Sequence, residues 1–503
     1  MYVDLSSNKF VGPFPKSCWN LTRLKSLNVA SNDMNSSLAI WLSGLSSSSS
    51  SSSSLVSLDL SFNSLQGLLP CSNQNLTALR YLYLTGCQLN STIMSSGFLH
   101  DLIRLEYLFL DNNNIEGVIS SAIQNLKSLV QLELSQNSLK GEMPTFVGNL
   151  VSLVYLDLSF NSLEGEIPTS LGNLCNLSDL SLGGNKFGGK VSNAFDSLLL
   201  TALQILDVAD NNLSGSMPKC FDNLKAMTIK QVLKDVISYS NFVGYFFEQV
   251  MVVTKGREDQ YDTILPLVNS LDLSSNKLTG EIPRQLTTLQ GLISLNLSGN
   301  FLKGRIPDSI GNMVWLESLD LSRNRLSGNI APSISSLTYL SYLNLSYNNL
   351  SGKIPLSTQL QSFDASSFIG NELCGQPLSN ICDEDQSKPT INNGAQKADD
   401  GDEVGRWFHL GIGTGFAVGF FGVLAPLLFS TTWRHAYFGF FGCLWDEILY
   451  KLSSSFVSVK IAFNMSPDGC IVTSVAAEET LRFCNVFLVP EVSKPAPNPK
   501  ANP

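Results

Sequence analysis

The chain has 503 residues, of which 15% are charged, and its formal net charge is -10. An acidic chain without a block of lysine and arginine lacks the electrostatic footprint of a nucleic-acid-binding protein, so we expect no nucleic-acid partner. The chain has only three histidines, which argues against a histidine-based catalytic centre or a zinc site. We therefore expect no enzymatic activity, no metal and no cofactor.

The chain before residue 363 is built from one repeated pattern, LxxLxLxxNxLxGxIPxxLxxLxx, with clear copies at 153–176, 292–315 and 316–339. The asparagine of the pattern, or the cysteine that once replaces it, occurs at 13 positions: Asn8, Asn32, Asn63, Cys87, Asn113, Asn137, Asn161, Asn185, Asn211, Asn276, Asn300, Asn324 and Asn348. Most steps are 24 residues long, but two are 26, one is 31 and one is 65. This period and leucine spacing predict a leucine-rich-repeat solenoid.

Each position of the pattern has a physical role. Successive strand residues point to opposite faces, so the two leucines of LxL face the core and the residue between them faces outward. No copy can bury its apolar face alone, and stacked copies therefore build an α/β-type repeat solenoid with a parallel sheet on its concave side. The asparagine can bond backbone groups in the bend after the strand, while glycine permits the tight turn and proline fixes the next segment.

The spacing divides this region into two repeat blocks. The first block, 1–218, begins in the middle of a copy and lacks the basic start and apolar run of a secretion signal, so we expect that a segment precedes Met1. An insertion without the pattern, 219–265, separates it from a final block of four copies, 266–362. A C-terminal cap, 363–382, follows.

The cysteines form no C-x-x-C pair, which argues against a zinc ribbon or a thioredoxin-type motif. Cys374 and Cys382 lie close together after the last copy, and we interpret them as a local disulfide. The other cysteines before residue 390 are Cys18, Cys71, Cys87, Cys175 and Cys220. Their number is odd, so at least one is free or lacks its partner in this chain, and their pairing stays open.

An acidic linker, 383–406, leads to a segment, 407–433, that we expect to cross a membrane once as a helix. Its 24 residues from Leu410 to Trp433 contain no charge, which is enough for a ~30 Å hydrocarbon core. Acidic residues precede this segment and basic residues follow it, so the tail, 434–503, is expected in the cytosol.

These features together resemble the plant leucine-rich-repeat receptor-like proteins. The resemblance rests on the LxGxIP copies, the cap sequence "NELCGQPL" at 371–378, the acidic linker, the single span and a tail without kinase motifs. It implies a right-handed superhelix held in the plasma membrane as a single-pass type I protein with the N-terminal part outside. Members of that family lack a kinase and signal through adaptor and co-receptor receptor kinases.

The resemblance implies a receptor for an extracellular peptide, protein or glycan elicitor, in plant immunity. Three alternatives stay open: a developmental receptor, a truncated decoy that does not signal, and an inhibitor of wall enzymes. Helix pairing with an adaptor kinase is implied by two G-x-x-x-G steps, at Gly411, Gly415 and Gly419. Glycine is also common in membrane spans without any such role.

The first candidate ligand-binding site is a cluster of aromatic residues on the concave face. The outward positions of two consecutive copies place Tyr81 and Tyr83 beside Tyr107 and Phe109. Clustered exposed aromatic residues are typical of interface anchors. The alternative is a cross-strand ladder that only stiffens the sheet.

The second candidate is the insertion. The resemblance implies that such an island folds against the concave face and helps to bind ligand, and its candidate residues are Lys255, Arg257, Glu258 and Tyr261. The alternative is that the insertion only packs on the solenoid and closes the break. The last copies are implied to contact a co-receptor, with the candidates Arg323, Tyr342 and Tyr347.

Nine N-x-S/T sequons precede the expected span and fit a glycosylated ectodomain. They lie at Asn20, Asn35, Asn75, Asn90, Asn176, Asn212, Asn296, Asn344 and Asn349. Asn296 and Asn344 occupy strand positions, so glycans on them would cover part of the concave face.

Overall fold

The computed structural model describes residues 1–12, 23–35, 37–41, 54–65, 76–90, 97–195, 200–230, 250–254, 257–261, 268–382, 462–465, 471–475 and 481–485. The chain divides into two compact units, Met1–Ser387 and Lys388–Pro503. The first unit holds all the repeats, and each copy of the pattern forms one turn of a solenoid.

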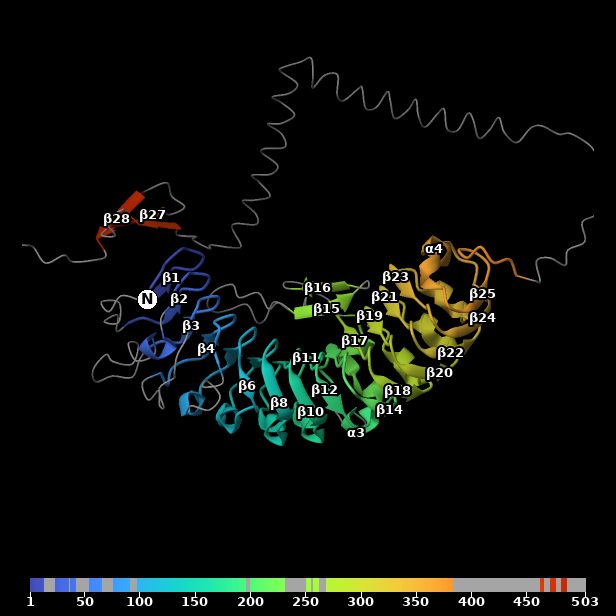
Figure 1. Ribbon diagram of the computed structural model, residues 1–503, viewed down its shortest axis with the longest axis horizontal. Coiled ribbons are helices and arrows are strands. Elements are labelled where there is room, and N and C mark those ends of the chain that lie inside the picture. Colours follow the sequence, from blue (N-terminus) through green and yellow to red (C-terminus); the bar gives the residue numbers. More distant parts are fainter. Residues whose placement is uncertain are drawn as a thin grey trace, which may run out of the picture. The chain divides into compact units, whose positions relative to one another are not determined.

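Short parallel strands of successive turns form a single 13-stranded sheet in chain order, along the inner side of the arc in Figure 1. Its strands are β1 (Tyr2–Asp4), β2 (Ser26–Asn28), β3 (Ser57–Asp59), β4 (Tyr81–Tyr83), β5 (Tyr107–Phe109), β7 (Gln131–Glu133), β9 (Tyr155–Asp157), β11 (Asp179–Ser181), β13 (Ile205–Asp207), β17 (Ser270–Asp272), β19 (Ser294–Asn296), β21 (Ser318–Asp320) and β23 (Tyr342–Asn344). The central residue of each strand faces the core; it is Val3 in β1 and a leucine in the other strands, of which Leu82 and Leu108 are fully buried. The predicted solenoid with a parallel sheet is confirmed.

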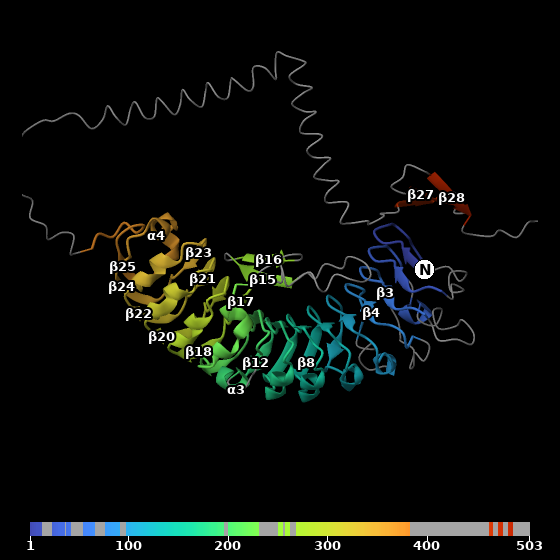
Figure 2. The ribbon, with the colours of Figure 1, turned by 180° about the vertical axis from the view of Figure 1, so that it is seen from behind.

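From β5 onward, the turns continue into a second row of strands, most of them followed by a short helix, and these elements lie toward the outer side of the arc (Figures 1 and 2). The second row contains β6 (Glu116–Gly117), β8 (Ser138–Glu142), β10 (Ser162–Glu166), β12 (Lys186–Gly188), β14 (Ser214–Ser216), β18 (Lys277–Gly280), β20 (Phe301–Gly304), β22 (Arg325–Gly328), β24 (Asn349–Lys353) and β25 (Glu372–Cys374). The 3-10 helices are η2 (Gly97–Asp101), η3 (Ser121–Asn125), η4 (Thr145–Asn149), η5 (Thr169–Asn173), η6 (Phe221–Asn223), η7 (Lys225–Thr228), η10 (Arg284–Thr288), η11 (Asp308–Asn312), η12 (Pro332–Ser336) and η13 (Ala365–Ser367). Two short α-helices are α3 (Val191–Phe195) and α4 (Thr358–Ser362).

The asparagines of the pattern form a ladder that ties each turn to both neighbours. Asn161 is representative: its Nδ2 donates to the carbonyls of Leu158 at 3.2 Å and of Leu134, in the preceding turn, at 2.9 Å. Its Oδ1 accepts from the backbone N–H of Leu139 at 2.9 Å. The amide thus satisfies backbone groups that the bend leaves without partners inside the core. Cys87 replaces one asparagine and offers only a thiol, 3.2 Å from the carbonyl of Leu60.

The insertion interrupts one turn without disturbing the sheet. Regular packing continues through Met227, which is fully buried, so the turn extends past the boundary at 219 that the spacing suggested. Strand β17 then pairs directly with β13, with Ile205 opposite Ser270. Within the insertion, β15 (Val250–Thr254) and β16 (Arg257–Tyr261) form an antiparallel hairpin.

The second unit contains three antiparallel strands, β26 (Ala462–Met465), β27 (Ile471–Val475) and β28 (Leu481–Asn485). None of the helices within the described residues is long and apolar enough to cross a membrane. The segment expected to do so, 407–433, lies outside those residues together with Gly411, Gly415 and Gly419.

Candidate ligand-binding face

The aromatic cluster of β4 and β5 consists of two ring pairs on neighbouring strands. The rings of Tyr81 and Tyr107 stack with centroids 5.0 Å apart and planes 20° apart. The rings of Tyr83 and Phe109 lie 4.8 Å apart with a tilt of 34°. Tyr81, Tyr107 and Phe109 are partly exposed, whereas Tyr83 is buried. We call these four residues the aromatic patch.

An ion pair borders the aromatic patch. The Arg80 guanidinium donates from Nε and Nη2 to the two carboxylate oxygens of Glu106, each at 2.7 Å, and its Cζ lies 5.8 Å from the Tyr81 ring centroid. A bidentate pair holds both side chains in one geometry, which fixes the edge of the patch. The sequence carried a signal for this pair, because opposite charges occupy the same position in consecutive turns.

Carboxyl groups follow the aromatic patch on the next strands. Glu133 of β7 lies opposite Phe109 on one side and Asp157 of β9 on the other. Burial raises the pKa of the Glu133 carboxyl, and Asp157 raises it further; burial likewise raises the pKa of Asp157. Asp111, just after β5, accepts a 2.7 Å hydrogen bond from the Thr85 hydroxyl, and burial raises its pKa to about 6.

The insertion residues are only partly described. Arg257, Glu258 and Tyr261 belong to β16, where Arg257 pairs with Thr254 in the hairpin. Strand β15 of the hairpin lies beside β19 of the 13-stranded sheet (Figure 1). Lys255 lies outside the described residues.

The candidate co-receptor residues fall into two places. The Arg323 guanidinium lies 5.4 Å from the centroid of the Tyr347 ring, and Tyr347 is half exposed. Tyr342 lies on the 13-stranded sheet instead, where its hydroxyl donates to Asp320 at 3.1 Å. The structure therefore brings Arg323 and Tyr347 together and keeps Tyr342 in the hydrogen-bond network of the sheet.

Asparagine and aspartate alternate on the sheet of the final block. Asn296 donates from Nδ2 to Asp272 at 2.9 Å, and Asn344 donates in the same way to Asp320 at 3.1 Å. Both asparagines are sequon residues, and both are partly buried. Other sequon asparagines are exposed: Asn35, Asn90, Asn176, Asn212 and Asn349. Asn20 and Asn75 lie outside the described residues.

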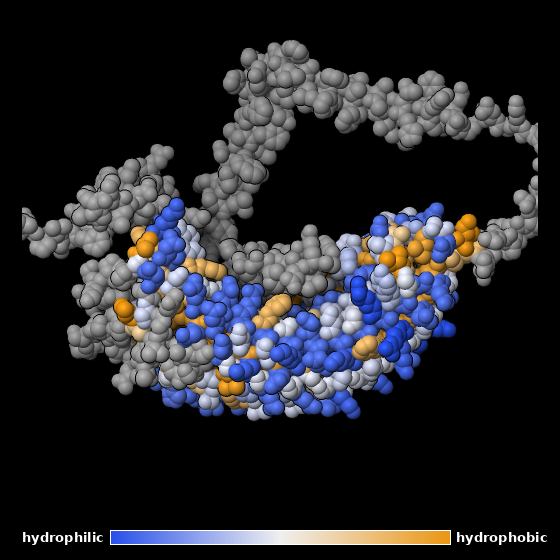
Figure 3. Space-filling view, viewed as in Figure 1, coloured by the Kyte–Doolittle hydropathy of each residue, from blue (hydrophilic) through white to orange (hydrophobic). Residues whose placement is uncertain are grey.

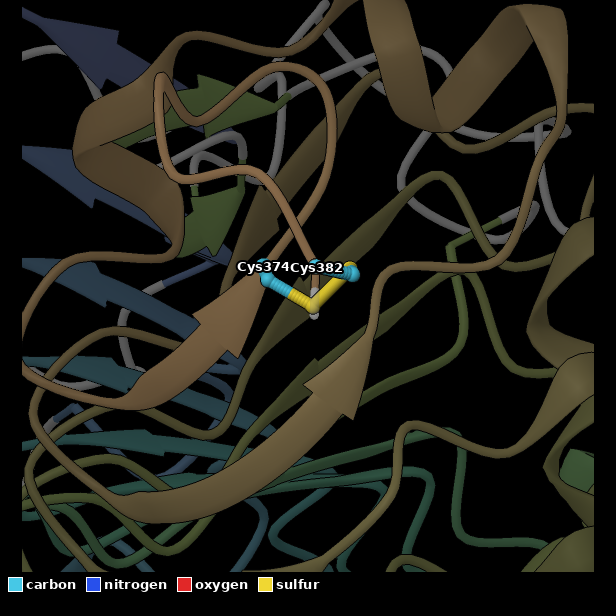
Figure 4. Close-up of a disulfide and its surroundings, with 2 residues drawn as sticks. All are labelled: Cys374 and Cys382. Atoms are coloured by element: carbon cyan, nitrogen blue, oxygen red, sulfur yellow. A yellow bond between two sulfur atoms is a disulfide. The ribbon is translucent and has the colours of Figure 1, made fainter. Parts of the chain in front are cut away.

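The cap closes the solenoid with a disulfide between Cys374 and Cys382, whose Cα atoms are 5.2 Å apart (Figure 4). In the described part of the chain, Cys87 and Cys175 are free thiols, and the Cys220 thiol donates to the carbonyl of Phe195 at 3.4 Å. Burial raises the pKa of Cys87 to about 12. Cys18 and Cys71 lie outside that part. The described residues contain no group of three or more acidic, histidine or cysteine side chains that could hold a metal ion.

Three family profiles match the chain, and all describe leucine-rich repeats. A "Leucine-rich repeat region" covers 54–234, a "Leucine rich repeat" covers 266–326, and a further "Leucine Rich Repeat" covers 339–360. The gap between the first two matches falls within the insertion.

Similar sequences include two tomato (Solanum lycopersicum) proteins. The chain is 56% identical to receptor-like protein EIX2 over 201 residues, which are 39% of this chain and 19% of EIX2. It is 55% identical to receptor-like protein EIX1 over 201 residues, 39% of this chain and 20% of EIX1. The matched region thus spans about a fifth of the length of each relative.

Similar solved structures include two receptors. A TDR receptor matches with a TM-score of 0.58 and 27% identity, covering 74% of this chain and 60% of that one. The Arabidopsis receptor kinase HAESA, solved with an IDA peptide hormone, matches with a TM-score of 0.52 and 30% identity, covering 75% and 58%. Profiles, relatives and fold agree, and the chain belongs to the leucine-rich-repeat proteins of the plant receptor-like type.

Proposed function

We propose that the chain is a cell-surface receptor that binds an extracellular polypeptide on the concave face at the aromatic patch. The observation that carries the proposal is the pairing of aromatic rings, with Tyr81 stacked on Tyr107 and Tyr83 in tilted contact with Phe109. Large rings held in place by neighbours lose little entropy on binding, which is why aromatic residues anchor interfaces. The tomato receptor-like proteins and the peptide-bound HAESA ectodomain support this proposal.

The rest of the receptor is proposed from the sequence. Residues 383–406 would link the solenoid to a membrane helix at 407–433, which pairs through its glycines with an adaptor kinase, and 434–503 would face the cytosol. The hairpin beside β19 would add to the ligand site, and Arg323 with Tyr347 would meet a co-receptor kinase. The role in immunity remains a prediction.

The experiment offers the full chain, solubilised in mild detergent and held by a C-terminal tag, to a random decapeptide library. We expect the unaltered chain to retain a peptide pool, and the double variant Tyr81→Ala, Tyr107→Ala to retain at least about 10-fold less, since each lost anchor costs more than 1 kcal/mol. The control is Tyr339→Ala, a half-exposed tyrosine outside the sheet. Equal retention by the double variant would remove the patch as the site.

A further inference from the structure

Three acceptor side chains meet beside the aromatic patch. Gln131 and Glu133 both belong to β7, and the Gln131 Nε2 donates to Glu133 Oε1 at 2.9 Å. Asp157 stands opposite Glu133 on β9. Gln131 is 1% exposed and Glu133 9% exposed. We call Gln131, Glu133 and Asp157 the acceptor cluster.

No cation pairs with the carboxyl groups of the acceptor cluster among the described residues. Among the described residues, the ion pairs are Arg80 with Glu106 and His100 with Asp101, so neither carboxylate of the cluster has one. A carboxylate pair removed from water is costly unless a positive group compensates it. A pair of carboxyl groups alone does not define a ligand-binding site.

The second observation is an orphaned oxygen. The Oε1 atom of Gln131 is buried and accepts no hydrogen bond, although its amide is tied to Glu133. A buried acceptor without a donor costs about 1–3 kcal/mol. Native structures keep few such groups, and each calls for an explanation such as a missing partner. The amide that contacts the Glu133 carboxyl group through its nitrogen therefore leaves its oxygen without a donor.

The fold does not require this arrangement. At the same strand position of the final block, Asn296 donates to Asp272 and Asn344 donates to Asp320. Each of these aspartates therefore has an amide donor on a neighbouring strand. One asparagine in place of Glu133 or Asp157 would achieve the same between β7 and β9. The acceptor cluster has two carboxyl groups at this position instead, and a hydrogen bond joins Glu133 to Asp157 next to the rings that we propose as the ligand anchor.

We propose that the acceptor cluster binds the cationic side chain, arginine or lysine, of a polypeptide whose neighbouring apolar residue rests on the aromatic patch. This inference rests on the proposed function. Guanidinium and ammonium groups supply several donors and a positive charge together, which matches two carboxylates and one amide oxygen. An organic cation with several N–H donors is therefore the occupant that this set of acceptors favours.

The test uses the same full chain and decapeptide library. We expect the pool retained by the unaltered chain to contain about 5-fold more arginine and lysine than the input pool. The double variant Glu133→Gln, Asp157→Asn should retain a pool without this enrichment. Glu164→Gln is the matched control, because Glu164 is an exposed carboxylate on β10, away from the 13-stranded sheet. Melting temperatures of all variants establish that they fold.

A retained arginine peptide and its citrulline analogue give the second measurement. The unaltered chain should bind the citrulline peptide at least about 10-fold more weakly, and the double variant should bind both alike. A retained pool without basic enrichment, or enrichment that survives in the double variant, overturns this inference and leaves the proposed function standing. No retained pool at all overturns the proposed function and this inference with it.

Discussion

Residues of the ladder that joins the turns differ in how many backbone hydrogen bonds they make. The amide of Asn161 satisfies several backbone groups at once, whereas the thiol of Cys87 makes one short contact with Leu60. We expect Asn161→Leu to lower the free energy of unfolding by roughly 2–4 kcal/mol, because it leaves buried carbonyls and an N–H without partners. Cys87→Ala should cost about 1 kcal/mol. Denaturant titration followed by circular dichroism measures both, and similar losses would contradict this difference.

Asp111 makes stability depend on pH. Burial raises its pKa from 3.8 to about 6, so the folded state prefers the protonated acid. Proton linkage gives the sign: the contribution of protonated Asp111 to folding stability is fully present below pH 4 and is lost as the pH rises to about 6. Asp111→Asn, which still offers an acceptor to Thr85, should therefore stabilise the fold at pH 7 by on the order of 2 kcal/mol.

The measurement is the unfolding midpoint of Asp111→Asn and of the unaltered chain at pH 4 and at pH 7. Glu133 and Asp157 have raised pKa values too and keep part of the dependence in the variant. Asp364→Asn is a control of opposite sign, since hydrogen bonds from Ser366 lower the pKa of that exposed carboxyl. A gain at pH 4 equal to that at pH 7 would rule out titration of Asp111 as the cause.

At the scale of elements, the start of the insertion is held by a glycine. The Gly291 N–H donates to the carbonyl of Met227 at 2.9 Å, and a Cβ on Gly291 would collide with the backbone of Ile229. Asn269, fully buried, donates to the carbonyl of Ile229 at 3.2 Å. Beyond it, the Lys230 ammonium lies 3.5 Å from the centroid of the Trp315 ring. Residues 227–230, which leave the solenoid, therefore pack against the two turns that follow.

We expect Gly291→Ala to displace residues 226–230 and to speed hydrogen exchange of their backbone amides by about 10-fold or more, since about 1.4 kcal/mol of local stability corresponds to a factor of ten. The matched control is Gly188→Ala, where an added Cβ meets no atom within 4 Å. Exchange measured by mass spectrometry compares the two variants. Unchanged exchange in Gly291→Ala would mean that the segment adapts without loosening.

The whole molecule keeps its glycosylation signals in two environments. Asn176, Asn212 and Asn349 are exposed. Asn296 and Asn344 instead donate hydrogen bonds from Nδ2 to aspartates of the sheet. A glycan on Nδ2 would displace these bonds and occupy the concave face. We expect the exposed asparagines to be modified and the two sheet asparagines to stay bare. Deglycosylation in isotopically heavy water followed by peptide mass spectrometry reads each site, and full occupancy of Asn296 would contradict the argument.

The repeat period was enough to predict the order of the strands and the burial of residues such as Leu82. It could not predict that outward residues such as Tyr83 and Glu133 are buried, because strands only about 4.8 Å apart let large side chains cover each other. The period also did not predict the burial of Met227, because a methionine stands there where the pattern has leucine. The orphaned oxygen of Gln131 depends on side-chain geometry and left no trace in the sequence. The face drawn in Figure 3 is largely hydrophilic, with scattered apolar spots and a larger apolar group toward the C-terminal end of the repeats, as expected when most leucines are buried inside the turns.

The insertion falls inside one turn, and the two sides of that turn meet without it. Strands β13 and β17 pair directly, Asn276 donates to the carbonyl of Val208 at 2.9 Å, and its Oδ1 accepts from the Leu213 N–H at 2.9 Å. Covalent continuity across residues 228–267 is therefore not what joins the two blocks. A protease cut in this stretch should yield a nicked protein whose two fragments elute together in size-exclusion chromatography. The two blocks would then behave as two chains that assemble through the sheet and the asparagine ladder.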